Sequence, residues 1–163
     1  MLPLRLLPAA AFACALTLGS CGSAKPEEIY DASRSEYTAG NYAAALQGFE
    51  QVIASDVDKK KKFGAMRYAL LCEAHTDALS AAHRFEALKQ DYTSYLTPEE
   101  LVNIGTGLAQ AQVTDLAVQV VEWGTENHPD SRAQFEKVTQ LVAKYGSDED
   151  AEALRKIGYL SGD

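Results

Sequence analysis

The chain has 163 residues, of which 47% are hydrophobic and 23% charged, and its 15 basic and 23 acidic side chains give a formal net charge of −8. This length suits a single domain and leaves little room for a second one. A surface this acidic repels phosphate backbones, so we expect no binding of nucleic acid.

The first twenty residues differ from the rest of the chain. Arg5 is their only charged side chain, and the uncharged stretch LLPAAAFACALTL (residues 6–18) follows it. A membrane-spanning helix needs about 20 apolar residues, and Pro8 weakens this shorter stretch further as a helix. A basic residue, a short apolar core and small residues are typical of an export signal. We therefore predict a signal peptide over residues 1–20 that is removed.

The end of this leader, Leu18-Gly19-Ser20-Cys21, resembles the lipobox of bacterial lipoproteins, a leucine followed by two small residues and a cysteine. The resemblance implies cleavage after Ser20, a diacylglycerol thioether on Cys21 and acylation of the new amino group. Two or more acyl chains anchor a protein stably to a membrane. Residues 21–25 are then a lipidated linker. The alternative is an ordinary secreted protein with a cysteine near its start.

The residue after the cysteine is Gly22 rather than aspartate, which in some bacteria implies sorting to the outer membrane. We therefore expect an exported, membrane-anchored protein on the periplasmic face of the outer membrane. Cys14 would be lost with the leader and Cys21 modified, so Cys72 would remain alone and no intramolecular disulfide could form. Loss of Arg5 leaves 14 basic and 23 acidic side chains, a net charge of −9.

Three short segments repeat at a spacing of 36 residues. They are ALQGFE (45–50), AAHRFE (81–86) and AVQVVE (117–122), and a fourth step reaches ALRKIG (153–158), which lacks the final glutamate. An alanine four places before a bulky residue lies on the same helix face as that residue. The alanine lets two helices approach, and the bulky side chain fills the groove between them. One helical hairpin cannot bury such a face alone, so we expect the copies to stack.

Each period predicts two antiparallel helices. In the first period they cover residues 26–39 and 42–54, and in the third 98–111 and 115–126. Both periods begin with a proline followed by two glutamates, which suits a first helical turn. No long stretch alternates with period two, so we predict no sheet.

We divide the chain into repeats at residues 26–61, 62–97 and 98–133, with a degenerate capping repeat at 134–163. In this last unit we expect one helix at Phe135, Val138, Val142 and Tyr145, and the next at Ala153, Ile157 and Leu160.

The segment EYTAGNYAAALQGFEQVI (residues 36–53) resembles the tetratricopeptide repeat, a unit of about 34 residues in two antiparallel helices. Gly40, Tyr42, Ala45 and Phe49 stand where that family has Gly, Tyr, Ala and Phe. The resemblance covers residues 26 to about 129. It implies an all-α fold, a right-handed α-solenoid of antiparallel helix pairs with about 3.5–4 repeats. A generic antiparallel helical bundle is the alternative.

In that family the first helix of each unit lines a concave groove. The resemblance implies groove positions at Tyr30, Arg34, Tyr37, Phe63, Met66, Leu70, Val102, Thr106 and Gln110. An apolar, methionine-containing surface flanked by tyrosine and arginine suits a protein or peptide partner. Leu70 and Val102 have the alternative of packing under neighbouring helices, whereas we expect Tyr30, Arg34 and Tyr37 to be exposed.

Residues with catalytic or metal-binding chemistry are sparse. Cys72 and His75 resemble half of a metal site, or a nucleophile and its base, but no second ligand pair and no Gly-x-Ser-x-Gly motif is present. Cys72 falls one period before Leu108, so we expect it in the core. The single basic run, Lys59–Lys62, is expected to be a solvated turn leading into a helix, with contact to anionic lipid as the alternative. We expect no catalytic residue, metal or cofactor.

These features predict a lipid-anchored scaffold or adaptor of the cell envelope. It would bind a protein or peptide through the concave face of the solenoid, without a catalytic step. Analogy with envelope lipoproteins suggests outer-membrane or pilus assembly. The alternatives are a structural helical module that associates with itself, and an enzyme using Cys72 and His75.

Overall fold

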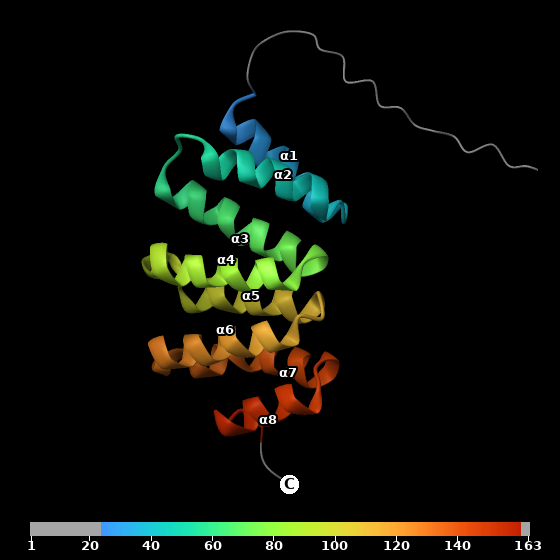
Figure 1. Ribbon diagram of the computed structural model, residues 1–163. Helices are drawn as coiled ribbons and strands as arrows, with labels where there is room; N and C mark the ends of the chain where they lie inside the picture. The colour runs from blue at the N-terminus through green and yellow to red at the C-terminus, as the bar shows by residue number, and fades with distance from the viewer. Residues whose placement is uncertain (1–23, 161–163) are drawn as a thin grey trace, which may run out of the picture.

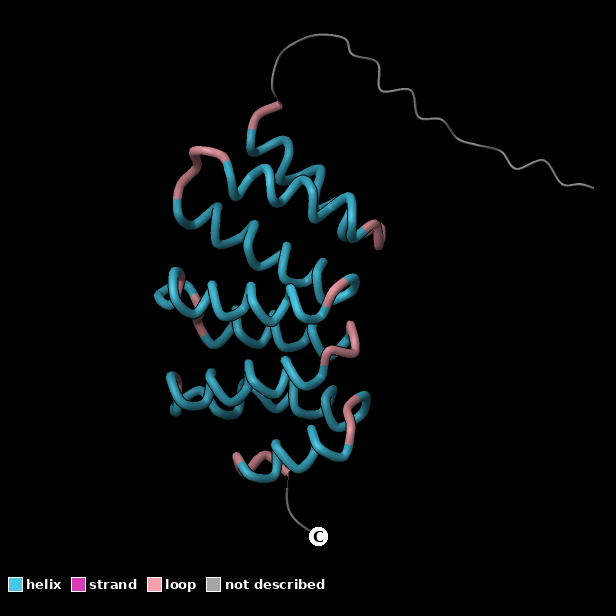
Figure 2. The backbone as a smooth tube through the Cα atoms, viewed as in Figure 1, coloured by secondary structure: helices cyan, strands magenta, loops and turns pink. Residues whose placement is uncertain are grey.

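A computed structural model describes residues 24–160 of the chain (Figure 1). Over this range the protein consists of eight α-helices and two 3-10 helices, with no strand among these residues (Figure 2). The predicted all-α class is therefore confirmed. The predicted leader and Cys21 lie outside the described residues. Within the described part, no helix has both the length and the apolar character needed to cross a membrane.

The helices follow the order expected from the repeat. They are α1 (Pro26–Thr38), α2 (Tyr42–Ala54), α3 (Lys59–Thr76), α4 (Ala78–Asp91), η1 (Thr93–Tyr95), α5 (Pro98–Gln110), α6 (Thr114–Asn127), η2 (Pro129–Phe135), α7 (Glu136–Tyr145) and α8 (Asp148–Lys156). The bounds predicted for α1, α2, α5 and α6 agree with these to within one residue at each end.

Local chemistry explains where the helices begin and end. The hydroxyl of Thr97 accepts a hydrogen bond from the backbone N–H of Glu100, and Asp58 accepts one from the N–H of Lys61 at 2.8 Å, so both residues act as N-caps. After α1, Gly40 adopts a φ of 82°. A glycine tolerates this left-handed conformation without strain, so the chain turns there into α2.

Consecutive helices run antiparallel and stack in chain order, as Figure 1 shows. Helix α1 packs against α2 and α3, α3 also against α4 and α5, and α5 also against α6 and α7. The odd-numbered helices are therefore neighbours of one another along the stack. The turns that lead into α1, α3 and α5 lie on the same side of the molecule.

The residues that carry the 36-residue repeat are buried. Ala45, Ala81 and Ala117 are 0% exposed, and so are the bulky Phe49 and Phe85 on the same helix faces. Burying a side chain as large as phenylalanine stabilises the fold by about 1.5–3 kcal/mol. The repeat in the sequence thus marks the contacts between helices.

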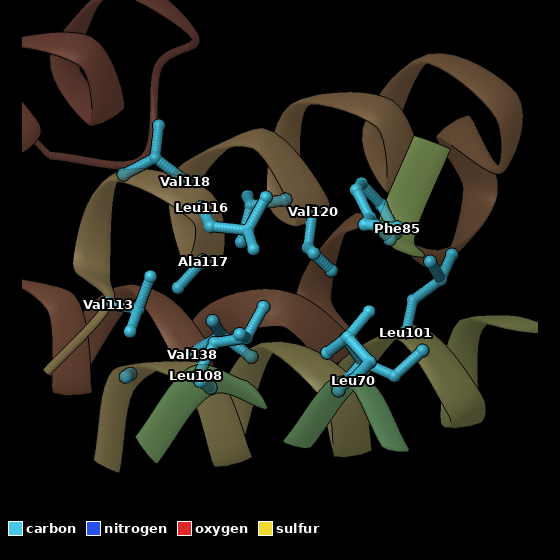
Figure 3. Close-up of a cluster of buried hydrophobic side chains, with 14 of the residues drawn as sticks. Leu70, Phe85, Leu101, Leu108, Val113, Leu116, Ala117, Val118, Val120 and Val138 are labelled. Atoms are coloured by element: carbon cyan, nitrogen blue, oxygen red, sulfur yellow. The ribbon is translucent and has the colours of Figure 1, made fainter. Parts of the chain in front are cut away.

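The core forms two clusters that meet in α3. The smaller one contains Ala45, Phe49, Val52, Ala65, Ala69 and Cys72, and the larger one runs from α3 to α8 (Figure 3). Leu70 of α3 belongs to the larger cluster, whereas Ala69 beside it belongs to the smaller. Helix α3 therefore joins the N-terminal hairpin to the rest of the stack.

The C-terminal unit departs in detail from the prediction. Val138 and Val142 are buried in α7 as expected, but Phe135 closes the preceding 3-10 helix and Tyr145 remains 43% exposed. Helix α8 ends at Lys156, so the two bulky residues predicted to continue it, Ile157 and Leu160, follow its end. They pack against the larger cluster from outside the helix.

Candidate partner-binding surface

Tyr68 of α3 is the centre of an aromatic cluster that α3 forms with α1 and α2. Its ring lies 6.1 Å from Tyr30, 5.4 Å from Tyr37 and 5.2 Å from Phe49, measured between ring centroids. The contacts with both tyrosines are edge-on, and the Phe49 ring is stacked. Such pairs add about 0.5–1.5 kcal/mol beyond the area they bury, so the rings have a defined arrangement. We call these four residues the Tyr68 cluster.

Two arginines flank the Tyr68 cluster. The guanidinium carbon of Arg67 lies 4.7 Å from the centroid of the Tyr68 ring, and that of Arg34 lies 5.7 Å from it. Arg34 is exposed, whereas Arg67 also donates from Nη1 to Glu100 Oε2 of α5 at 2.6 Å. A cation over an aromatic face is stabilised by about 0.5–1 kcal/mol at an exposed site. The surface therefore combines half-buried phenols with fixed positive charge.

The ionisation of these groups follows from their surroundings. Burial raises the pKa of Tyr30 and of Tyr37, so both phenols stay neutral at physiological pH. The electrostatic effect of Tyr68 raises the pKa of Arg34 above its ordinary value. The cluster thus presents hydroxyl groups and a permanent cation rather than a titrating group.

A hollow of ≈ 370 Å³ adjoins the cluster where α1, α3 and α5 meet. Its floor includes Phe63, which is only 5% exposed and stacks on the Tyr95 ring. Gly64 leaves room for Tyr30, because a Cβ at that position would lie 2.9 Å from the Tyr30 hydroxyl. The other lining residues are Lys60, Arg67, Ser94, Thr97 and Glu100. The hollow therefore offers hydroxyls and charges around an apolar floor.

The groove residues predicted for the first unit come together, whereas those predicted for the second are divided: Phe63 lines the hollow, and Met66 does not. Tyr30 and Tyr37 are half-buried and Arg34 is exposed, and all three adjoin Tyr68. The Sδ of Met66, by contrast, accepts from Arg84 Nη1 of α4 at 3.4 Å, which places Met66 in the α3–α4 contact.

Leu70 is 0% exposed, so the alternative that it packs under neighbouring helices is correct. Val102 and Thr106 are half-buried and Gln110 is exposed. The Oγ1 of Thr106 is buried without a hydrogen-bond partner among the described residues. Neither Thr106 nor Gln110 lines the hollow beside the Tyr68 cluster.

Sequence reasoning missed Arg67 and Tyr68, which directly follow Met66, one of the positions assigned in the second unit. The segment FGAMRYALL (residues 63–71) contains a signal that could have found them, because this adjacent pair is its only charged and its only hydroxyl-bearing residue. When an arginine and a tyrosine occur within an otherwise apolar helix, each is expected to contact a polar partner or to reach the surface. Here Arg67 bonds to Glu100, and both side chains remain partly exposed.

The residues considered for nucleophilic chemistry are arranged unfavourably for it. Cys72 is 0% exposed, and burial raises the pKa of its thiol to about 12, so hardly any reactive thiolate exists at neutral pH. The His75 ring stacks on Tyr42 with centroids 3.8 Å apart, and burial lowers its pKa. Among the described residues, no group of three or more His, Cys, Asp or Glu side chains is arranged to hold a metal ion.

Comparison with protein-family models, with curated proteins and with solved structures finds no match to this chain.

Proposed function

We propose that the chain is a scaffold or adaptor of the cell envelope that binds a protein or peptide partner and has no catalytic step. The observation that carries this proposal is the Tyr68 cluster with Arg34 at its exposed edge. Tyrosine and arginine are enriched among the residues that contribute most to protein–protein binding. Half-buried rings are already ordered, so they lose little conformational freedom when a partner contacts them.

We further propose that the helices form a right-handed, tetratricopeptide-like solenoid, with units at residues 26–61, 62–97 and 98–133 and a cap at 134–163. The 36-residue repeat and the contacts of α3 with α1 and α5 support this arrangement. In such a stack the odd-numbered helices line one face. A partner lying across that face meets Arg34 of the first unit and Arg67 of the second.

The lipobox-like segment supports the localisation that we propose. Acylation of Cys21 would hold the scaffold at the periplasmic face of the outer membrane, and the partner would then be another envelope protein. Outer-membrane or pilus assembly is the role suggested by analogy with envelope lipoproteins. The buried thiol of Cys72 weighs against the enzyme alternative. The remaining alternative is a structural module that associates with itself through the C-terminal cap.

Co-purification from cell membranes after chemical cross-linking tests the proposal. We compare the wild type with Arg34→Ala and with a matched control, Lys144→Ala, because Lys144 is also an exposed cation over a tyrosine ring, 4.7 Å from the centroid of Tyr145. A partner should be captured by the wild type and the control. Arg34→Ala should bind it about tenfold more weakly, the effect of losing a contact worth about 1.4 kcal/mol.

Thermal unfolding must show that both variants are as stable as the wild type. Equal capture by Arg34→Ala and the wild type would refute a partner site at the Tyr68 cluster. Capture of only a second copy of the chain, lost when residues 131–163 are removed, would favour the self-associating module.

A further inference from the structure

The first turn of α3 consists of four consecutive lysines, Lys59–Lys62. They lie beside the first turn of α1, because Lys61 Nζ forms an ion pair with Glu27 Oε1 at 2.9 Å. Figure 1 shows the starts of α1 and α3 on the same side of the stack. The lysine run is therefore fixed next to the point at which the described chain begins, and it belongs to the helix rather than to a turn before it.

This concentration of positive charge contributes little to the stability of the fold. The N-terminus of a helix carries a partial positive charge, so cations in the first turn oppose helix formation, and Asp58 is the only acid that caps α3. Lys61 has its ion pair, and Lys59 Nζ lies 5.4 Å from the Tyr92 ring centroid. In residues 24–160, Lys60 and Lys62 form no ion pair.

We propose that Lys25, Lys59, Lys60 and Lys62, which we call the lysine corner, contact the anionic headgroups of the bilayer that holds the lipid on Cys21. This inference rests on the lipid anchor of the proposed function. Five residue steps separate Cys21 from Pro26, and even a fully extended chain of that length spans at most about 18 Å. The anchor thus keeps the lysine corner near the membrane surface.

The charge distribution along the chain favours the same orientation. Residues 24–97 contain nine basic and eleven acidic side chains, whereas residues 98–163 contain five and twelve. An anionic membrane therefore repels the C-terminal half more strongly. Three acids beside the lysine corner already have partners: Glu27 pairs with Lys61, Asp58 caps α3 and Glu28 accepts from the backbone N–H of Lys25. Each lysine near an anionic surface contributes about 1 kcal/mol.

Lysine acetylation on vesicles tests this contact. The protein made with its leader is purified from membranes, the mass of the peptide containing Cys21 is measured, and the protein is reconstituted into vesicles of phosphatidylcholine alone or mixed with phosphatidylglycerol. On the anionic vesicles, Lys59, Lys60 and Lys62 should react about fivefold more slowly with an acetylating ester than on the neutral ones. Molar salt should abolish the difference. Lys137 and Lys144 serve as internal controls whose rates should not change.

Two variants make the test sharper. Lys60→Gln/Lys62→Gln should remove the protection of Lys59, and Lys137→Gln/Lys144→Gln should leave it intact. If Cys21 carries an acyl adduct and the rates on the two kinds of vesicle are equal, the lysine contact is wrong and the anchor stands. If Cys21 carries no adduct, both the anchor and the contact are wrong.

Discussion

The reactivity of Cys72 distinguishes a scaffold from an enzyme that uses this thiol. Cys72 is 0% exposed in the smaller core cluster, which α3 shares with α2, and burial, assisted by the neighbouring Glu73, raises the pKa of its thiol from 9.0 to about 12. A rise of three units leaves about 1000-fold less thiolate than an ordinary cysteine has at the same pH. Because the thiolate is the nucleophile, alkylation should be slower by at least about the same factor.

The assay uses a chain with Cys14→Ser and Cys21→Ser, so that Cys72 is its single thiol. Its rate of modification by iodoacetamide in mildly alkaline buffer is followed by mass spectrometry. The same chain unfolded in concentrated guanidinium chloride provides the reference rate. A folded rate within about tenfold of this reference would refute the argument from burial. It would also bring back the alternative in which Cys72 acts with His75.

Three further substitutions test the packing of the stack by urea unfolding. Arg84 donates two hydrogen bonds, of 2.7 and 2.6 Å, to Glu73, which is 7% exposed. Arg84→Met should lower the free energy of unfolding by about 3–5 kcal/mol, because it leaves the Glu73 charge unpaired. Adding Glu73→Leu should restore most of the lost stability. Gly124→Ala would place a Cβ 2.4 Å from the fully buried Phe135 ring, so it should destabilise the protein by about 1–2 kcal/mol despite its better helix propensity. Burial alone would raise the pKa of Asp150, but hydrogen bonds from a backbone N–H and two hydroxyls outweigh it and lower the pKa. Asp150→Asn should therefore cost about 1–2 kcal/mol near neutral pH, and its effect should fade below a pH of about 4, as protonation removes the same stabilisation from the wild type. No loss for Arg84→Met or Gly124→Ala, or a loss for Asp150→Asn that is constant with pH, would contradict the respective argument.

The helical fold could be predicted because its signals are either local or regularly spaced along the chain. Pro26 and Pro98, each followed by two glutamates, identify the first turns of α1 and α5, and the buried alanines at 45, 81 and 117 recur at one spacing. The C-terminal unit was less predictable. There Arg132 donates to the carbonyl of Ile157, and Tyr159 donates to the carbonyl of Arg132 at 2.9 Å. Such contacts between distant residues leave no periodic pattern, so the ends of α7 and α8 could not be placed.

Of the candidate site, only the residues of the first predicted repeat could be identified from the sequence. A repeat shows which residues are equivalent, but it does not show which of them are covered by neighbouring helices. Arg34 and Leu70 are equivalent at the 36-residue spacing, yet Arg34 is exposed and Leu70 is 0% exposed. Leu70 lies in the cluster that α3 shares with α4 and α5, whereas Arg67, three residues earlier, lies over the Tyr68 ring. The two arginines that flank Tyr68 are 33 residues apart, and no comparison at the repeat spacing would pair them. The proposed partner surface therefore depends on the contact between α1 and α3, and it could be recognised only once these two helices were placed side by side.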